Sequence, residues 1–329
     1  MAIPYSRYIF GSVPWYSLLI TLGVVFAVFL SIREEKRIGL PKDTILDLSL
    51  WIIPIGIIGA RLYYVLFSWQ QFSGNPVSVL YIWEGGIAIY GAVISGFLTA
   101  LVFCKMRKLP LLQICDIIAP GLVLAQSTGR WGNYFNMEAY GPAVRNPSLC
   151  FFPLCVLIPS AGGNEWHLAT FFYESVCDFL IFLFLMFARR KWLRKQGDVF
   201  CFYVLFYGTI RLFIEELRTD SLYMHSDIRI SQLLSCVACL FVHFVFLRRL
   251  RFSRIRRIPR FLMLILEGLY FLFSGFMVLY CLQIIPAGLF ALRQKLLILA
   301  GFSMMTIVLN VLLYGHSERA EVLYADDKS

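Results

Sequence analysis

The sequence is short of charged residues. Asp, Glu, Lys and Arg together make up only 15% of its 329 residues, whereas a soluble domain of ordinary composition has about 25%. Hydrophobic residues account for 59% of the chain, and the mean hydropathy is +0.73. A composition with so little polar surface excludes a soluble two-domain enzyme, a disordered chain and a secreted disulfide scaffold. We therefore predict a protein that crosses a membrane several times.

The signals of a cleaved leader and of a metal site are also missing. Only Arg7 precedes the first apolar run, so we expect no cleavable signal peptide. Cys236 and Cys239 are spaced like metal ligands but have no second ligand pair, and the four histidines are far apart in the sequence. We therefore expect no metal and no other cofactor. Cys150 and Cys155 lie in a polar connection, where a disulfide and two free thiols both remain open.

Nine apolar runs are each close to the roughly 20 residues that one membrane-spanning helix needs. They are residues 13–32, 45–67, 86–103, 111–128, 169–188, 199–217, 230–247, 261–282 and 296–314. Backbone polar groups inside a bilayer must be satisfied within helices or closed barrels. We therefore predict an all-α polytopic membrane protein with nine spanning helices.

The Lys and Arg residues are concentrated in alternate connections between these runs. The connection after the seventh run contains seven arginines, whereas no basic residue lies between Trp69 and Glu84. Basic connections stay on the cytoplasmic side, which places the N-terminus outside and the C-terminus in the cytoplasm. The net charge of +10 would suggest a nucleic-acid partner in a soluble protein. At the ends of membrane helices the same charge favours anionic membrane lipids, so we expect no nucleic-acid partner.

Strongly polar residues at membrane depth all fall on the outer side. Charged residues inside spanning helices are costly and are candidates for function. Reading each run in its own direction places six such residues toward the outer end: Tyr16, Arg61, Tyr90, Arg130, Arg211 and Glu215. Two interpretations remain open. The three arginines could form structural ion pairs with Glu84, Glu138 and Glu215, or they could form a ligand site that faces outward.

Residues 129–141 have an unusual composition for the junction between a span and a connection. They contain three glycines, Arg130, Glu138 and the two asparagines Asn133 and Asn136. Arginine offers a planar fork that matches phosphate oxygens, and glycine lets the backbone approach a ligand closely. The asparagines add neutral hydrogen bonds, and Glu138 can orient the arginine. This pattern favours an outward-facing site for a phospholipid headgroup.

A second arginine lies on a polar ridge in the run 199–217. Four residues of this run are spaced four apart and so share one helix face: Tyr203, Tyr207, Arg211 and Glu215. The simplest alternative is that Arg211 and Glu215 only neutralise each other. The convergence of two or more arginines at headgroup depth favours a phosphate over a carboxylate ligand.

Residues 129–141 resemble the signature of the bacterial prolipoprotein diacylglyceryl transferase family. Six further blocks resemble that family in the same order along the chain: 15–16, 59–66, 83–86, 170–175, 207–221 and 230–235. Each block alone would be weak evidence. Together they extend over about residues 10–250, which makes the resemblance specific.

The resemblance implies an architecture, a location and a reaction. Seven core helices would occupy residues 1–250. The last two apolar runs depart from the family by extending beyond these seven, so residues 251–329 are predicted to form a basic loop, two additional transmembrane helices and a short cytoplasmic tail. The protein would lie in the bacterial cell (inner) membrane. Its substrates would be phosphatidylglycerol and a prolipoprotein whose signal peptide carries the lipobox cysteine. The cysteine thiol would displace glycerol phosphate from the diacylglyceryl group and form a thioether.

The resemblance also assigns roles to individual residues. Arg130 and Arg211 match the pair expected to bind the phosphate, and preorganised arginines stabilise charge that grows on a leaving phosphate. The predicted catalytic residues are Arg130, Arg211, Glu138, Asn133 and Tyr90. The predicted substrate-binding residues are Arg130, Arg211, Arg61, Asn136, Gly141, Tyr16, Tyr207 and Glu215.

One position departs from the family pattern. Many members carry His where this chain has Tyr90, and a phenol with a pKa of about 10 is a poor base at neutral pH. Tyr90 could orient the substrate or act as a phenolate, the leaving phosphate could take the thiol proton, and His167 is a weaker alternative base. The departure also leaves open a second class of protein, a non-catalytic phospholipid-binding or lipid-transporting relative.

Overall fold

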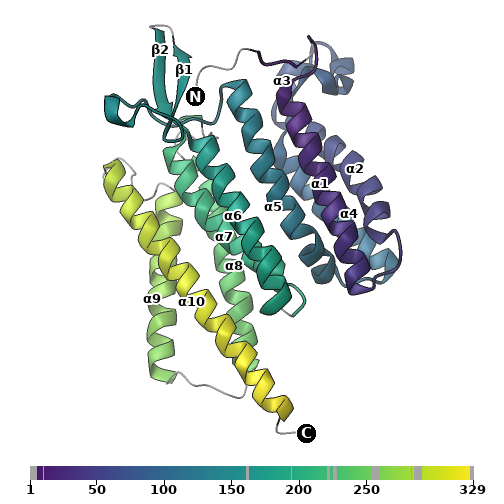
Figure 1. Ribbon diagram of the computed structural model, residues 1–329, viewed down its shortest axis with the longest axis vertical. Coiled ribbons are helices and arrows are strands. Elements are labelled where there is room, and N and C mark those ends of the chain that lie inside the picture. Colours follow the sequence, from purple (N-terminus) through teal and green to yellow (C-terminus); the bar gives the residue numbers. More distant parts are fainter. Residues whose placement is uncertain are drawn as a thin grey trace.

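The computed structural model describes residues 6–9, 11–160, 163–193, 195–220, 223–224, 228–252, 260–282, 284 and 291–326. Helices dominate this part of the chain (Figure 1). The long helices are α1 (Trp15–Ile38), α2 (Thr44–Phe67), α4 (Ile89–Arg107), α5 (Leu111–Asn136), α6 (Thr170–Lys191), α7 (Asp198–Leu217), α8 (Ile230–Phe252), α9 (Arg260–Cys281) and α10 (Leu292–Asp326). The short helical turns are α3 (Trp69–Phe72), η1 (Pro76–Leu80), η2 (Ile82–Glu84) and η3 (Pro147–Leu149).

Eight of the long helices in the described residues are long and apolar enough to cross a membrane: α1, α2, α4, α5, α6, α8, α9 and α10. This confirms the prediction of an all-α polytopic membrane protein. The one predicted span missing from this set is the run 199–217. It forms α7, a helix of 20 residues that contains Asp198, Arg211, Glu215 and Glu216. Its charged residues, and not its length, set α7 apart from the other eight.

Two short β-hairpins interrupt the helical chain. β1 (Cys155–Ser160) pairs antiparallel with β2 (Gly163–Leu168) in the connection between α5 and α6, and β3 (Tyr223–Met224) pairs with β4 (Ile228–Arg229) before α8. Figure 1 shows β1–β2 at the end of the bundle where α1 begins. The sequence did not predict these strands, because they are too short to show a clear alternation of apolar and polar residues.

The two cysteines near β1 are both free thiols. The Cys150 Sγ contacts the carbonyl oxygens of Val144 and Asn146. Cys155 is buried at the start of β1, and burial raises the pKa of its thiol. The disulfide that the sequence left open is therefore not formed in this structure.

Small residues let neighbouring helices approach closely, as is common between membrane helices. A Cβ atom on Gly121 of α5 would lie 2.8 Å from the Cα of Ala27 in α1, so these two helices touch at their backbones. At the crossing of α2 and α4, a Cβ on Gly91 would overlap the carbonyl oxygen of Gly59. Two rigid contacts, α1 with α5 and α2 with α4, thus shape the N-terminal half of the bundle.

Basic residues gather at one end of the bundle. The carboxylate of Glu34 in α1, which is 3% exposed, lies 2.6 Å from Arg37, 3.3 Å from Arg189 and 2.9 Å from Arg190. The last two arginines close α6, so the C-terminal ends of α1 and α6 meet here. We call this the basic end, and we call the opposite end, which carries β1–β2 and the C-terminal ends of α5 and α7, the hairpin end (Figure 1).

The last two helices pack on the core through α7 and α8. Near the basic end the Tyr314 hydroxyl of α10 donates to the Trp192 carbonyl at 2.8 Å and to the Asp198 carboxylate at 2.9 Å. Farther along, the Nδ1 of His243 in α8 lies 3.2 Å from the Oδ1 of Asn310. Polar groups inside a bilayer strengthen helix association when they find partners in this way. Much of the arginine-rich connection between α8 and α9, residues 253–259, lies outside the described residues.

Candidate active site

The two candidate phosphate-binding arginines meet at the hairpin end of the bundle. Arg130 lies near the C-terminal end of α5, and Arg211 lies in the second half of α7. Both contact one carboxylate, Glu174 in the second turn of α6: the Glu174 Oε1 is 2.7 Å from Arg130 Nη2 and 3.0 Å from Arg211 Nη1. The second oxygen of Glu174 also accepts from Arg211, at 3.1 Å. The convergence of Arg130 and Arg211 is therefore part of the fold.

Glu174 was absent from the predicted site residues. Its side chain is fully buried, with a relative exposure of 0%, and it draws three helices together at one point. The sequence did contain a signal, because Glu174 is a carboxylate at spanning depth and lies in the block 170–175 that resembles the family. What it lacked was the information that α6 packs against both α5 and α7.

The predicted polar ridge of α7 is confirmed. The rings of Tyr203 and Tyr207 stack with centroids 5.8 Å apart, and the Arg211 Nη2 lies 2.7 Å from the Glu215 carboxylate. The i,i+4 ion pair therefore exists, but Arg211 also reaches across to α6, so mutual neutralisation with Glu215 is not its only contact.

Buried carboxylates balance the arginines. Arg211 contacts Glu174 and Glu215, and its side chain is 12% exposed, while Arg130 contacts Glu174 and is 20% exposed. Asp178 lies one turn deeper in α6 with an exposure of 0%, and its carboxyl oxygens have no hydrogen-bond partner among the described residues. A guanidinium has five N–H donors, so these contacts do not exhaust Arg130. An entering anion could therefore use the remaining donors of Arg130 while Glu174 stays in place.

The asparagines of residues 129–141 surround Glu138. The Nδ2 atoms of Asn133 and Asn136 donate to the Glu138 Oε1 at 3.2 Å and 2.9 Å. The Oδ1 of Asn136 accepts from Arg7 Nε at 2.8 Å, a contact that we had not predicted. We had expected Glu138 to orient an arginine of its own segment; among the described residues its side-chain hydrogen bonds instead join it to the two amides.

Tyr16 and Gly141 mark places where the chain packs tightly. Tyr16 covers Gly132 in α5, where a Cβ would lie 2.5 Å from the ring Cδ2. A Cβ on Gly141 would lie 2.8 Å from the Leu217 carbonyl oxygen at the end of α7, and the Gly141 N–H donates to the Leu168 carbonyl at 2.9 Å. Gly141 thus joins β2 to the end of α7, beside the ridge that carries Arg211.

Asp220 ties the same loop to the residues after α7. Its carboxylate accepts from the Ala139 N–H at 3.0 Å and from the Arg218 guanidinium at 3.0 Å and 3.1 Å. Burial alone would raise the pKa of Asp220, but the hydrogen bonds and the charge of Arg218 outweigh it, and the pKa is lowered. Asp220 therefore stays a carboxylate at neutral pH and holds the loop as an anion.

Arg61 lies apart from the arginine pair. It is 6% exposed and donates to the carbonyl oxygens of the segment that follows α3: Ser78, Val79, Tyr81, Gly85 and Gly86. Arginine is well suited to gather several carbonyls because its donors are fixed in a planar fork. The contacts of Arg61 thus organise this loop, whereas we had grouped Arg61 with the substrate-binding residues.

Tyr90 and His167 are also separate from the arginine pair. The Tyr90 hydroxyl at the start of α4 lies 3.4 Å from the Ser231 Oγ in the first turn of α8. The His167 Nδ1 lies 2.8 Å from the Gly141 carbonyl oxygen, and its ring packs edge-on against Tyr140 with centroids 4.8 Å apart. His167 thus helps to hold the loop through Nδ1, and its Nε2 lies 3.7 Å from the Glu165 carboxylate.

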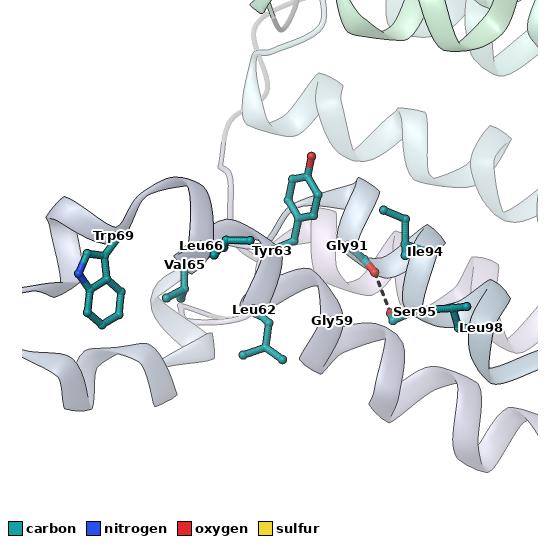
Figure 2. A pocket seen from close by; sticks show the side chains of 10 residues that line it. All are labelled: Gly59, Leu62, Tyr63, Val65, Leu66, Trp69, Gly91, Ile94, Ser95 and Leu98. Atoms are coloured by element: carbon teal, nitrogen blue, oxygen red, sulfur yellow. Dashed lines mark hydrogen bonds between the residues drawn. The ribbon is translucent and has the colours of Figure 1, made fainter. Parts of the chain in front are cut away.

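An apolar groove of about 500 Å³ runs between α2 and α4 (Figure 2). Its residues are Gly59, Leu62, Tyr63, Val65, Leu66, Trp69, Gly91, Ile94, Ser95 and Leu98. Figure 2 shows the Ser95 hydroxyl turned back to its own helix, where it donates to the Gly91 carbonyl at 2.7 Å. The groove therefore presents almost only apolar atoms and carries none of the charged groups of the site.

The fold and site together define a multi-pass membrane protein built around two half-buried arginines that share one buried carboxylate. A family model described as prolipoprotein diacylglyceryl transferase matches residues 6–248. This chain belongs to that family. Helices α9 and α10 lie beyond the matched residues.

Curated relatives carry the name phosphatidylglycerol–prolipoprotein diacylglyceryl transferase. The protein of Limosilactobacillus reuteri is 46% identical over 229 residues, which cover 69% of this chain and 83% of the relative. The protein of Lactobacillus delbrueckii subsp. bulgaricus is 42% identical over 240 residues, covering 72% and 87%. The protein of Enterococcus faecalis is 44% identical over 226 residues, covering 68% and 81%.

Proposed function

We propose that this protein transfers the diacylglyceryl group of phosphatidylglycerol to the cysteine thiol in the lipobox of a prolipoprotein signal peptide. The reaction forms a carbon–sulfur bond and breaks the carbon–oxygen bond to the phosphate. Glycerol phosphate leaves, and in the overall balance it takes up the proton that the thiol loses. The family membership and the arginine pair together support this assignment.

The contact of Arg130 and Arg211 with one carboxylate carries the proposal. Glu174 holds both guanidinium groups where a single anionic group can bridge them. Negative charge grows on the phosphate as the carbon–oxygen bond breaks, and donors that are already oriented stabilise that charge without reorganising. Arg130, the more exposed of the two, is proposed to meet the lipid phosphate first.

The other predicted residues take supporting roles in this proposal. Asn133, Asn136 and Glu138 form a hydrogen-bonded rim beside Arg130. Tyr16 and Gly141 fix the helices that frame this rim. Glu215 holds Arg211 from α7, Tyr207 lies one turn before Arg211 on the same ridge, and Arg61 shapes the loop after α3.

Tyr90 is proposed to orient a substrate where the start of α4 meets the start of α8. A free cysteine with a pKa of about 8.5 is mostly protonated at neutral pH, so the thiol must lose its proton during transfer. A phenol of ordinary pKa is a poor acceptor for that proton. We therefore assign Tyr90 to substrate contact and not to the role of the base.

The proposed orientation places the hairpin end outside the bacterial inner membrane. Glu34 and the arginines around it mark the basic end, and basic helix ends stay cytoplasmic. The start of α1 then lies outside, and the end of α10 lies in the cytoplasm. Residues 1–250 would form the transferase core, and residues 251–329 would add the basic loop, two helices and a short tail.

Mass spectrometry of an acceptor peptide tests this function. The purified protein would be incubated with phosphatidylglycerol vesicles and a peptide that contains a lipobox cysteine. We expect the mass of the diacylglyceryl group to be added to the peptide, and none to be added when serine replaces the cysteine. Binding of phosphatidylglycerol without any added mass would instead identify a non-catalytic lipid-binding protein.

A further inference from the structure

Two adjacent carboxylates at the hairpin end of α7 face different partners. Glu215 contacts Arg211, as described above. Glu216, the next residue, is 7% exposed and lies against the helices that follow α7. Successive residues of a helix are about 100° apart around its axis, since one turn contains about 3.6 residues. Any rotation of this last turn would therefore move both carboxylates together.

The Glu216 carboxylate collects contacts from four later segments. Arg229 of β4 donates to its Oε2 at 2.6 Å, and the Gln232 Nε2 of α8 donates to the same oxygen at 3.1 Å. The Tyr280 hydroxyl, in the last turn of α9, lies 3.4 Å from this oxygen. The Lys295 Nζ, in the first turn of α10, lies 3.5 Å from the other oxygen, Oε1. Tyr280 and Lys295 both lie beyond the residues matched by the family model.

We propose that the helix pair α9–α10 is a positioning element for the arginine site. Lys295 and Tyr280 would act through Glu216 to fix the last turn of α7, and through that turn they would set the place of Glu215 and Arg211. Lys295 and Tyr280 are thus positioning residues and not catalytic ones. This inference rests on the proposed function only for the identity of the anion that Arg211 binds.

The contacts around Glu216 show how its partners can affect Arg211 through the backbone of α7. The Gln232 Nε2 donates both to Glu216 and to the backbone carbonyl of Leu212, the residue after Arg211, at 3.2 Å. The group that holds Glu216 therefore also holds the helix backbone beside the site. Lys295 is 19% exposed and Glu216 is 4% exposed at the side chain, so their attraction is only partly screened by water.

An effect of α9 and α10 on the position of Arg211 can be distinguished from a general loss of their packing on the core. Tyr314 docks the same α10 at the basic end, about 27 Å away along α7 from Glu216 at a rise of 1.5 Å per residue. Loss of the Tyr314 hydroxyl would weaken docking without touching Glu216. Arg293 lies two residues from Lys295 on α10 and is exposed, so it provides a matched loss of one positive charge.

The test measures phosphatidylglycerol binding and diacylglyceryl transfer by the full chain in lipid nanodiscs. Binding would be followed as the thermal shift on titration with phosphatidylglycerol against phosphatidylcholine alone. We expect Lys295→Met to lower the affinity and the turnover number each about three- to tenfold, which is the size of a coupling between contacting charged groups. Lys295→Arg should restore both, and Arg293→Met and Tyr314→Phe should behave like the unmodified protein.

A double-mutant cycle shows whether Lys295 acts through Glu216. In the Glu216→Gln background, Lys295→Met should cause no further loss. Additive losses would overturn the proposal, and so would unchanged binding and turnover in Lys295→Met or an equal loss in Tyr314→Phe. A protein that binds phosphatidylglycerol with the expected Lys295 dependence but transfers nothing would uphold this inference and reject the transferase assignment. If Lys295→Met transfers the diacylglyceryl group at the normal rate, the transferase assignment is upheld and the positioning role is rejected. If the unmodified protein neither binds phosphatidylglycerol nor transfers the group, both proposals are rejected.

Discussion

At the scale of residues, the site depends on one buried acid between two arginines. Glu174 contacts Arg130 and Arg211 and is fully enclosed by α5, α6 and α7. Buried ion pairs of this kind add little net stability, because desolvation offsets the attraction, but loss of one partner leaves an uncompensated charge. Here that loss would leave two like charges side by side, which would push the guanidinium groups apart.

The first prediction concerns Glu174→Gln, which keeps the shape of the side chain and removes its charge. A hydrogen bond to a charged group is worth about 1.5–3 kcal/mol, and each 1.4 kcal/mol is a factor of ten, so transfer should slow about 10- to 100-fold. The initial rate of peptide modification measures this. Asp43→Asn, an exposed residue just before α2, removes one negative charge away from the site and should keep the full rate. Full activity in Glu174→Gln would mean that the arginine pair is held by other contacts.

The second prediction concerns Tyr90→Phe. If Tyr90 orients a substrate through its ring, the variant should lose less than about tenfold in rate, because one neutral hydrogen bond is worth about 0.5–1.5 kcal/mol. The dependence of the rate on pH should keep its shape. A measurable residual rate that no longer rises with pH toward the pKa of a phenol would instead show that the phenol is the base.

At the scale of elements, close helix crossings fix where the side chains of the site point. Gly59 of α2 and Gly91 of α4 bring two backbones into contact, and Gly132 receives the ring of Tyr16. These glycines are visible in the sequence, but their partners are not, since any small residue can serve several crossings. The sequence therefore predicted the helices and left the pairs of helices undetermined.

The third prediction tests the crossing of α2 and α4. Gly91→Ala would place a Cβ against the backbone of Gly59 and Ala60, which cannot yield as a flexible side chain could. Overpacking of this kind costs about 1–3 kcal/mol, more than the roughly 1 kcal/mol that alanine gains over glycine in a helix. The midpoint of thermal unfolding in detergent should therefore fall. Gly96→Ala on the same helix should not lower it, because its Cβ would lie 3.6 Å from Ile52, an ordinary contact. Equal midpoints for the two variants would contradict the crossing.

At the scale of the whole molecule, the sequence predicted the membrane class, the helices and the arginines of the site. Apolar runs of spanning length and the segment 129–141 contain that information directly. The role of Glu174 could not be predicted, because it depends on α6 packing against both α5 and α7. The contact between Lys295 and Glu216 could not be predicted either, because it joins residues far apart in the chain. The backbone carbonyl partners of Arg61 could not be predicted for a similar reason, since a pattern of side chains does not show them.

The central claim is that Arg130 and Arg211 act together on one phosphate. The most direct measurement is the rate of diacylglyceryl transfer to a lipobox peptide by Arg130→Ala, Arg211→Ala and the double variant. Groups that act as a unit are not additive, so we predict that each single variant loses as much activity as the double variant. Full activity in either single variant, or losses that simply multiply in the double variant, would contradict a shared phosphate site.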